Sequence, residues 1–194
     1  AAPSADDVAL RNATLRFVTR HSAAKDKAVR YRCCQLLAAT MRHMAADGEV
    51  DDELFERMRD ALATRTYDRV ACVRVEAAQA LCRLQVPDAA SDDHVVLRYA
   101  ELLDDDASKD VRNMAVQCVA ITKHTLRAVL ARTRDTADDV RVAAYEVVAA
   151  KVPCRALSIA QRQRLVDGGL RDRCRHVRAK CTRMLVDNWL PAER

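Results

Sequence analysis

The side chains with the clearest chemical potential in this sequence are cations that could hold phosphate groups. Residues 171–183 carry six basic side chains against one acid, Asp172. A basic patch of this density can bind a phosphate-rich partner. The same stretch is equally typical of a solvated helix face in an arginine-rich protein, because the chain has 27 Arg and only 6 Lys.

Cysteine and histidine could supply metal ligands, because the chain has eight Cys and five His. Their densest grouping is Cys174, His176 and Cys181, but on a helix the two cysteines share a face and His176 points elsewhere. No C-x-x-C motif occurs, and Cys33 and Cys118 occupy small apolar positions of the repeat described below. We therefore expect no metal site and no cofactor, and we expect reduced thiols, as in the cytosol or nucleus.

The sequence offers little for catalysis. Three glycines cannot build a glycine-rich phosphate loop, and neither H-E-x-x-H nor G-x-S-x-G occurs. DNA glycosylases built from HEAT-like helices need an aromatic cleft that holds a damaged nucleotide. The seven aromatic residues are instead spread along the chain, as core residues would be. We expect no catalytic residues and no enzymatic activity.

A repeated motif predicts the elements that position the cations. Five times a Val-Arg pair is followed by a small residue four positions after the Val and by apolar residues at plus seven and plus eight. These motifs begin at Val29, Val73, Val111, Val140 and Val177. The positions i, i+4, i+7 and i+8 form one stripe on an α-helix. The spacing of the motifs is that of a helical-repeat protein, closest to HEAT.

The predicted fold is therefore all-α, a HEAT-repeat α-solenoid of about five helical hairpins, each with an A helix, a turn and a B helix. We expect a single array over residues 1–194, with repeats at about 7–46, 51–86, 92–122, 125–152 and 158–190. No run of eighteen apolar residues occurs, so no membrane span is expected. The lack of an initiator Met indicates a piece of a longer chain.

The motif also predicts which side chains are buried. Ten stripe residues should lie in the core: Val29, Leu37, Val73, Leu81, Val111, Val119, Val140, Val148, Val177 and Leu185. Asp51 and Ser158 are candidate N-caps of A helices. The pair Gly168-Gly169 is a candidate C-cap that would end the last A helix.

The turns before the B helices carry acids that could cap those helices and pair with the Arg of the motif. In HEAT arrays such Asp and Arg residues commonly form a ladder between neighbouring repeats. We therefore expect at least three of the motif arginines to lie within hydrogen-bonding reach of an Asp or Glu: Arg30, Arg74, Arg112, Arg141 and Arg178. Direct contact of these arginines with a ligand is the alternative.

Several stretches go beyond the generic repeat, above all residues 27–37, 73–85 and 155–162. The run Ala-Leu-Ser-Ile-Ala-Gln-Arg, which begins at Ala156, is not required by the packing of HEAT helices. In order and spacing these stretches resemble the N-terminal HEAT repeats of the condensin subunit 3 family, over about Leu15 to Leu190.

The resemblance implies a scaffold subunit that does not use ATP. Members of this family bind the kleisin subunit, contact other condensin subunits indirectly, and with the kleisin hold double-stranded DNA without sequence specificity. The complex compacts chromosomes in mitosis. The resemblance therefore implies a location in the nucleus and on the chromosome, with the cytoplasm outside mitosis, and no membrane partner.

Seven cations precede or open the predicted B helices, where stacked repeats could align them for contact with DNA phosphates. They are Lys25, Lys27, Arg69, Lys109, Arg173, Arg175 and Lys180. The charge distribution also supports an alternative, a HEAT adaptor that binds only protein partners. Residues 51–150 carry a net charge of −5, whereas residues 1–50 carry +3 and residues 151–194 carry +7.

Overall fold

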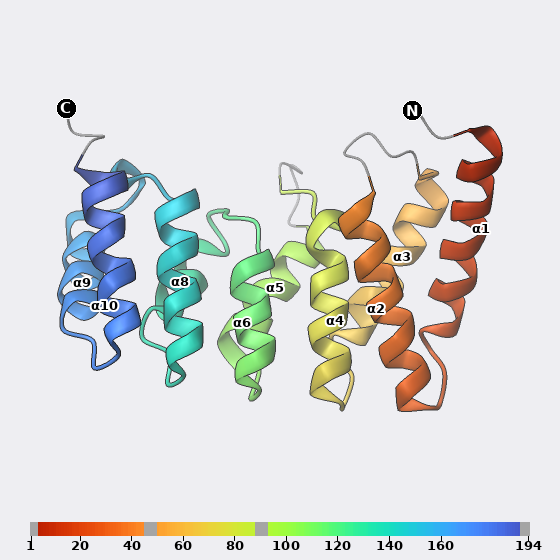
Figure 1. Cartoon of the computed structure of the whole chain (residues 1–194), viewed down its shortest axis with the longest axis horizontal. Helices are drawn as coiled ribbons and strands as arrows, with labels where there is room; N and C mark the ends of the chain where they lie inside the picture. Colours follow the sequence, from red (N-terminus) through yellow and green to blue (C-terminus); the bar gives the residue numbers. More distant parts are fainter. Residues whose placement is uncertain (1–3, 45–49, 88–92, 191–194) are drawn as a thin grey trace. The chain divides into compact units, whose positions relative to one another are not determined.

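The computed structural model describes residues 4–44, 50–87 and 93–190. Within these ranges the chain folds into α-helices joined by short turns, and no strand occurs (Figure 1). The helices form two compact units, Ala1–Val95 and Val96–Arg194. The predicted single array over residues 1–194 stays a prediction, and the two units are described separately.

The first unit contains two helical hairpins. Helices α1 (Ala5–His21) and α2 (Lys27–His43) form the first, and helices α3 (Asp52–Arg65) and α4 (Ala71–Leu81) form the second. Helix α1 packs against α3, and α2 packs against α4, so the A helices and the B helices form two layers. A short 3₁₀ turn, Cys82–Leu84, follows α4.

The second unit holds three more helix pairs. They are α5 (His94–Asp105) with α6 (Lys109–Cys118), α7 (Leu126–Arg132) with α8 (Asp138–Lys151), and α9 (Ile159–Leu170) with α10 (Arg175–Arg183). The first two residues of α5 belong to the first unit. The B helices stack in the order α6, α8 and α10, and α10 continues as a π-helical segment, Met184–Trp189. The predicted all-α fold of five helical hairpins is confirmed for the described residues.

Polar side chains define where several helices begin. The Asp26 carboxylate accepts hydrogen bonds from the backbone N–H groups of Ala28 and Val29 at the start of α2. Asp51 accepts from the N–H of Leu54 at 2.8 Å, and Ser158 forms a reciprocal capping box with Gln161. Both predicted N-caps are therefore confirmed. None of the described helices is long and apolar enough to cross a bilayer.

Eight of the ten predicted stripe residues are buried, and Val29 and Leu185 are not. Val29 is 41% exposed because the buried face of α2 begins one residue later, at Arg30, and continues through Cys34 and Leu37. Leu185 lies in the π-helical segment, where the N–H of Leu190 donates to its carbonyl at 2.9 Å. The extra residue per turn brings Met184 and Trp189 inward and leaves Leu185 only half-buried.

The prediction that Gly168-Gly169 ends α9 is wrong. Both glycines lie inside α9, and neither has a positive φ. Gly169 is required by close packing instead, because a Cβ at this position would lie 2.5 Å from the sulfur of Cys181 and 2.7 Å from Cζ of Tyr145. At Gly168 the same Cβ would meet only the hydroxyl of Tyr145, at 3.8 Å. A bare backbone at Gly169 thus lets α9 approach α8 and α10.

These two adjacent glycines make a matched pair for testing the helix contact. We expect Gly169→Ala to lower the free energy of unfolding by about 1–3 kcal/mol, since overpacking a filled core forces side chains or backbone to shift. Gly168→Ala should be neutral or stabilising by up to about 1 kcal/mol, because alanine favours the helix and finds room. Urea unfolding followed by circular dichroism measures both. Equal effects of the two substitutions would contradict the close-packing interpretation.

Candidate nucleic-acid interface

The turns between A and B helices are joined by arginine–aspartate pairs. In the second unit, Nε and Nη2 of Arg112 each donate to one carboxylate oxygen of Asp135 at 2.8 Å. Arg141 makes the same two-pronged contact with Asp172, also at 2.8 Å for both bonds. Each arginine thus reaches from its own B helix to the A–B turn of the next hairpin. Such bidentate pairs combine charge attraction with a fixed geometry.

The same arginines also bind the backbone of their own turns. Nη1 of Arg112 donates to the carbonyl of Asp106 at 2.8 Å, and Nη1 of Arg141 donates to the carbonyl of Asp135, also at 2.8 Å. Nη1 of Arg178 meets the carbonyl of Asp172 in the same way, at 2.7 Å. In Arg112 and Arg141, one guanidinium therefore donates both to the backbone of its own turn and to the aspartate of the next turn.

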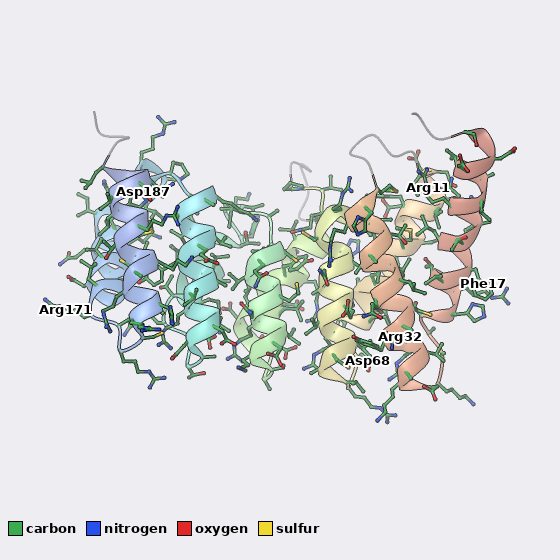
Figure 2. All side chains as sticks on the ribbon, viewed as in Figure 1. Arg11, Phe17, Arg32, Asp68, Arg171 and Asp187 are labelled. Carbon is green, nitrogen blue, oxygen red and sulfur yellow. The ribbon has the colours of Figure 1, made fainter. Side chains whose placement is uncertain are left out.

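The first unit repeats this arrangement. Arg30 donates to both carboxylate oxygens of Asp68, at 2.6 and 3.0 Å, and is only 6% exposed. Nη1 of Arg30 donates to the carbonyl of Lys25 at 2.7 Å, and Nη1 of Arg74 donates to the carbonyl of Asp68 at 2.8 Å. Figure 2 shows Asp68 at the foot of α4, where the α3–α4 turn enters the helix.

The ladder prediction is confirmed by Arg30, Arg112 and Arg141, but the predicted capping role of the paired aspartates is wrong. Each arginine pairs with the aspartate of the following hairpin, and Arg141 also donates to Asp138 of its own hairpin at 2.8 Å. The ladder aspartates do not cap the B helices, because each accepts the N–H two residues later, which belongs to the residue before the helix. These bonds run from Val70 to Asp68, from Ala137 to Asp135 and from Cys174 to Asp172.

The sequence carried a signal for the correct aspartates that the motif analysis missed. An aspartate lies five residues before the motif Val in four of the five repeats, at Asp68, Asp106, Asp135 and Asp172. In the fourth hairpin, Asp138 and Asp139 lie in the first turn of α8 and closer to the motif Val. The fixed spacing from the Val identifies Asp135 instead.

Ionisation of the ladder aspartates is coupled to these contacts. Burial by itself raises the pKa of Asp135, but hydrogen bonds from Arg112 and from the N–H of Ala137, with the charges of Arg112 and Arg132, outweigh it and lower the pKa to about 2. The hydrogen bond from Arg30 likewise lowers the pKa of Asp68. The ladder is therefore fully ionised at neutral pH.

The seven candidate DNA-binding cations lie outside this ladder. Lys25, Lys27 and Arg69 are exposed on the turns of the first unit. Lys109 and Arg173 are exposed in the second unit, with 58% and 77% of their side chains accessible. The structure does not place the two units relative to each other, so whether the two groups share one surface stays a prediction.

The candidates of the second unit make intramolecular contacts at the surface. Lys109 lies 3.0 Å from Asp139, and this hydrogen bond raises the pKa of the lysine. Arg173 donates to the carbonyl of Thr136 at 3.2 Å. The prediction that Lys180 opens its B helix is wrong, because it is the sixth residue of α10; it is half-buried and lies 2.5 Å from Glu146. Arg175 is exposed and donates to His176 at 3.4 Å. Exposed ion pairs contribute less than about 1 kcal/mol, so a phosphate could displace these partners.

The described residues contain no cluster of His, Cys, Asp or Glu that could hold a metal ion. All eight cysteines are free thiols. Cys181 is buried against Gly169, whereas His176 is exposed. Burial raises the pKa of the Cys181 thiol to about 11, so this side chain acts as a small apolar group.

Known proteins similar to this chain share one name. Condensin complex subunit 3 of Xenopus laevis is 37% identical over 179 residues, and its human counterpart is 36% identical over 187 residues. These matches cover 92% and 95% of the chain but only 17% and 18% of the relatives. The chain thus spans less than a fifth of the length of these two relatives. No family model matches the chain.

Solved structures agree with this similarity. The crystal structure of the S. pombe condensin Cnd3–Cnd2 subcomplex contains a chain that is 33% identical, with a TM-score of 0.84. The match covers 96% of this chain and 25% of that one. A designed armadillo repeat protein in complex with a (KR)4 peptide shares the fold alone, at 14% identity and a TM-score of 0.59, over 93% of this chain and 84% of that one.

The contribution of the ladder to the free energy of unfolding can be compared with that of a surface ion pair that links the same two hairpins. Arg141→Met should lower the free energy of unfolding by about 3–5 kcal/mol, because it leaves the Asp172 carboxylate half-buried and without its arginine. Glu146→Gln, which removes the exposed pair with Lys180, should cost less than about 1 kcal/mol. Urea denaturation at neutral pH tests both variants. Similar losses from the two would contradict a structural role for the ladder.

The depressed pKa of Asp135 predicts a loss of stability in acid. A carboxyl whose folded pKa lies below its unfolded value near 3.8 stabilises the fold above pH 4, and this contribution disappears as the pH falls through about 2. The loss should be about 2 kcal/mol. Urea titrations between pH 5 and pH 2 should show a smaller pH dependence for Asp135→Asn than for the wild type. An unchanged slope would contradict the assignment.

Proposed function

The chain belongs to the condensin complex subunit 3 family, and on this premise we propose that it is part of a non-catalytic HEAT scaffold subunit of condensin. The observation that carries the proposal is identity of 35–37% to proteins of that name over more than nine-tenths of the chain. The repeated helical hairpins are consistent with it, because stacked hairpins offer long surfaces to long partners.

The first proposed partner is the kleisin subunit of condensin. The solved relative was crystallised as a subcomplex of Cnd3 with Cnd2, which supports a protein partner for this type of subunit. Other condensin subunits would be contacted indirectly through it. We propose a location in the nucleus and on the chromosome, and in the cytoplasm outside mitosis.

The second proposed partner is double-stranded DNA, held together with the kleisin and without sequence specificity, in support of mitotic chromosome condensation. Cations at or near the A–B turns would contact phosphates, and the ladder arginines would not, since most of their donors are already used. Phosphate contacts alone carry no sequence information and weaken steeply with salt. The proposed contacts are the seven candidates named above, from Lys25 to Lys180.

An adaptor that binds only proteins is the second candidate function, and one observation favours it. In the second unit, Asp138 and Asp139 lie on the same turn edge as Lys109 and Arg173 and pair with them. Carboxylates at that edge reduce its attraction for phosphate. A DNA-binding measurement on the kleisin-bound chain distinguishes the two functions, because only the condensin scaffold is expected to bind DNA.

Charge reversal in the C-terminal hairpin tests the DNA proposal. We expect a variant with Arg173→Glu, Arg175→Glu and Lys180→Glu, in complex with a kleisin fragment, to lose affinity for DNA by at least about tenfold at low salt. The slope of log K against log salt should fall by about one for each lost phosphate contact. Fluorescence anisotropy with two unrelated 30-bp duplexes, at four salt concentrations, measures both quantities.

The matched control reverses three other exposed cations of the same unit, Lys123, Arg127 and Arg164. This control should bind DNA within about threefold of the wild type if the turn edge is the contact surface, since distant exposed charges are largely screened. Circular dichroism verifies the fold of each variant. Unchanged binding by the folded triple variant would remove these residues from the DNA contact. Absence of DNA binding by the wild-type complex would favour the protein adaptor.

A further inference from the structure

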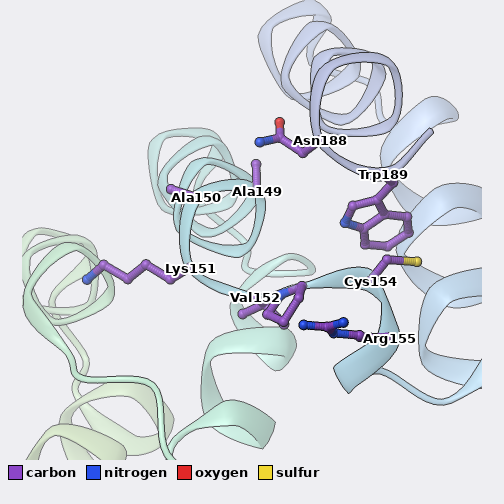
Figure 3. Close-up of a pocket in the computed structure, with 9 residues that line it drawn as sticks. Ala149, Ala150, Lys151, Val152, Cys154, Arg155, Asn188 and Trp189 are labelled. Atoms are coloured by element: carbon purple, nitrogen blue, oxygen red, sulfur yellow. The ribbon is translucent and has the colours of Figure 1, made fainter. Parts of the chain in front are cut away.

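A hollow of about 550 Å³ lies in the second unit, at the edge opposite the A–B turns (Figure 3). The C-terminal end of α8, the segment 152–155 and the end of the π-helical segment surround it. Its floor is buried, since Val152, Cys154 and Trp189 are 3%, 8% and 6% exposed. Its rim is exposed and polar, with Lys151, Arg155 and Asn188. A buried floor with a polar rim is the anatomy of a binding pocket.

The charged side chains that line this hollow are both cations. None of its nine lining residues carries a carboxylate, whereas Arg155 and Lys151 are cations. The Lys151 ammonium faces α6, where it lies 3.4 Å from the carbonyl of Val119. The Asn188 amide offers further donors on the rim. Arg155 and the Asn188 amide therefore favour a ligand that brings oxygen acceptors and negative charge.

An unpaired donor points to the same chemistry. Nε1 of Trp189 is buried and has no hydrogen-bond partner among the described residues. In Figure 3 the nitrogen edge of the indole ring faces the interior of the hollow, on the side of Ala149 and Asn188. Buried indole N–H groups ordinarily have an acceptor. This N–H has less than 1 Å² of accessible surface, so a ligand oxygen would supply the missing partner once the indole turns it into the hollow.

We propose that this pocket binds an acidic side chain of an extended peptide segment in a protein partner. The carboxylate would accept from Trp189 and Arg155, and its methylene groups would pack on Val152 and Pro153. These apolar walls favour a carboxylate on a hydrocarbon chain over an inorganic phosphate, which has no apolar part to bury. The inference goes beyond the proposed function and does not depend on binding of DNA or of the kleisin.

Trp189 makes the proposal directly measurable, because it is the only tryptophan of the chain. The 194-residue chain is titrated at low salt with a capped tetraglutamate peptide, with its tetraglutamine analogue and with inorganic phosphate, and indole fluorescence is followed. We expect a saturable change with tetraglutamate alone. Arg155→Ala should weaken this binding by about tenfold, whereas Arg164→Ala, an exposed arginine outside the hollow, should leave it within about twofold.

The donor role of the indole requires a second readout, since Trp189→Phe removes the fluorophore. Isothermal calorimetry with tetraglutamate should show binding about fivefold or more weaker in Trp189→Phe, which keeps an aromatic ring but lacks the N–H group. No saturable change with tetraglutamate, equal binding of tetraglutamine, binding of phosphate alone, or unchanged affinity in Arg155→Ala or Trp189→Phe would each overturn the proposal.

Discussion

The contact between successive hairpins within each unit depends on a buried bidentate pair between one arginine and one aspartate. Arg112–Asp135 and Arg141–Asp172 span hairpins of the second unit, and Arg30–Asp68 spans those of the first. Hairpins that touch only through apolar stripes could slide along each other, because apolar contact is not directional. A two-pronged hydrogen bond to a fixed carboxylate removes that freedom. The ladder therefore sets the register in which the stripes meet.

A buried ion pair is stabilising only when its remaining hydrogen-bond capacity is satisfied. Here the arrangement meets that requirement on both sides. The third nitrogen of Arg141 donates to the carbonyl of Asp135, and the carboxylate of Asp172 also accepts the N–H of Cys174. Each aspartate thus contributes its side chain to the preceding hairpin and its carbonyl to the arginine of its own. Because one residue serves two interfaces, the turns of a unit are structurally coupled.

The sequence predicted the features that depend on local periodicity. The Val-Arg motif located the five B helices and most of their buried stripe, and it identified the arginines of the ladder. It could not predict the rotation of α2 that exposes Val29, nor the π-helical turn that displaces Leu185, since both depend on the packing of neighbouring helices. Gly169 was misread for the same reason. A helix-ending glycine and a close-packing glycine look alike until Cys181 and Tyr145 are placed beside it.

The candidate site was less predictable than the fold, because a cation in a sequence does not reveal its partner. Arg30, Arg112 and Arg141 are held in the ladder, and most of their donors are used in intramolecular hydrogen bonds. The cations left for phosphate are those whose partners are exposed, such as Lys109 with Asp139, where an incoming anion competes with a weak surface pair. At the opposite edge, the Trp189 pocket presents donors and no carboxylate among its lining residues. The two edges of the second unit thus differ. One offers cations already balanced by acids, and the other offers an indole N–H without an acceptor among the described residues. A polyanion could bind the first edge only by replacing several weak surface pairs at once, whereas a single well-placed carboxylate suits the second.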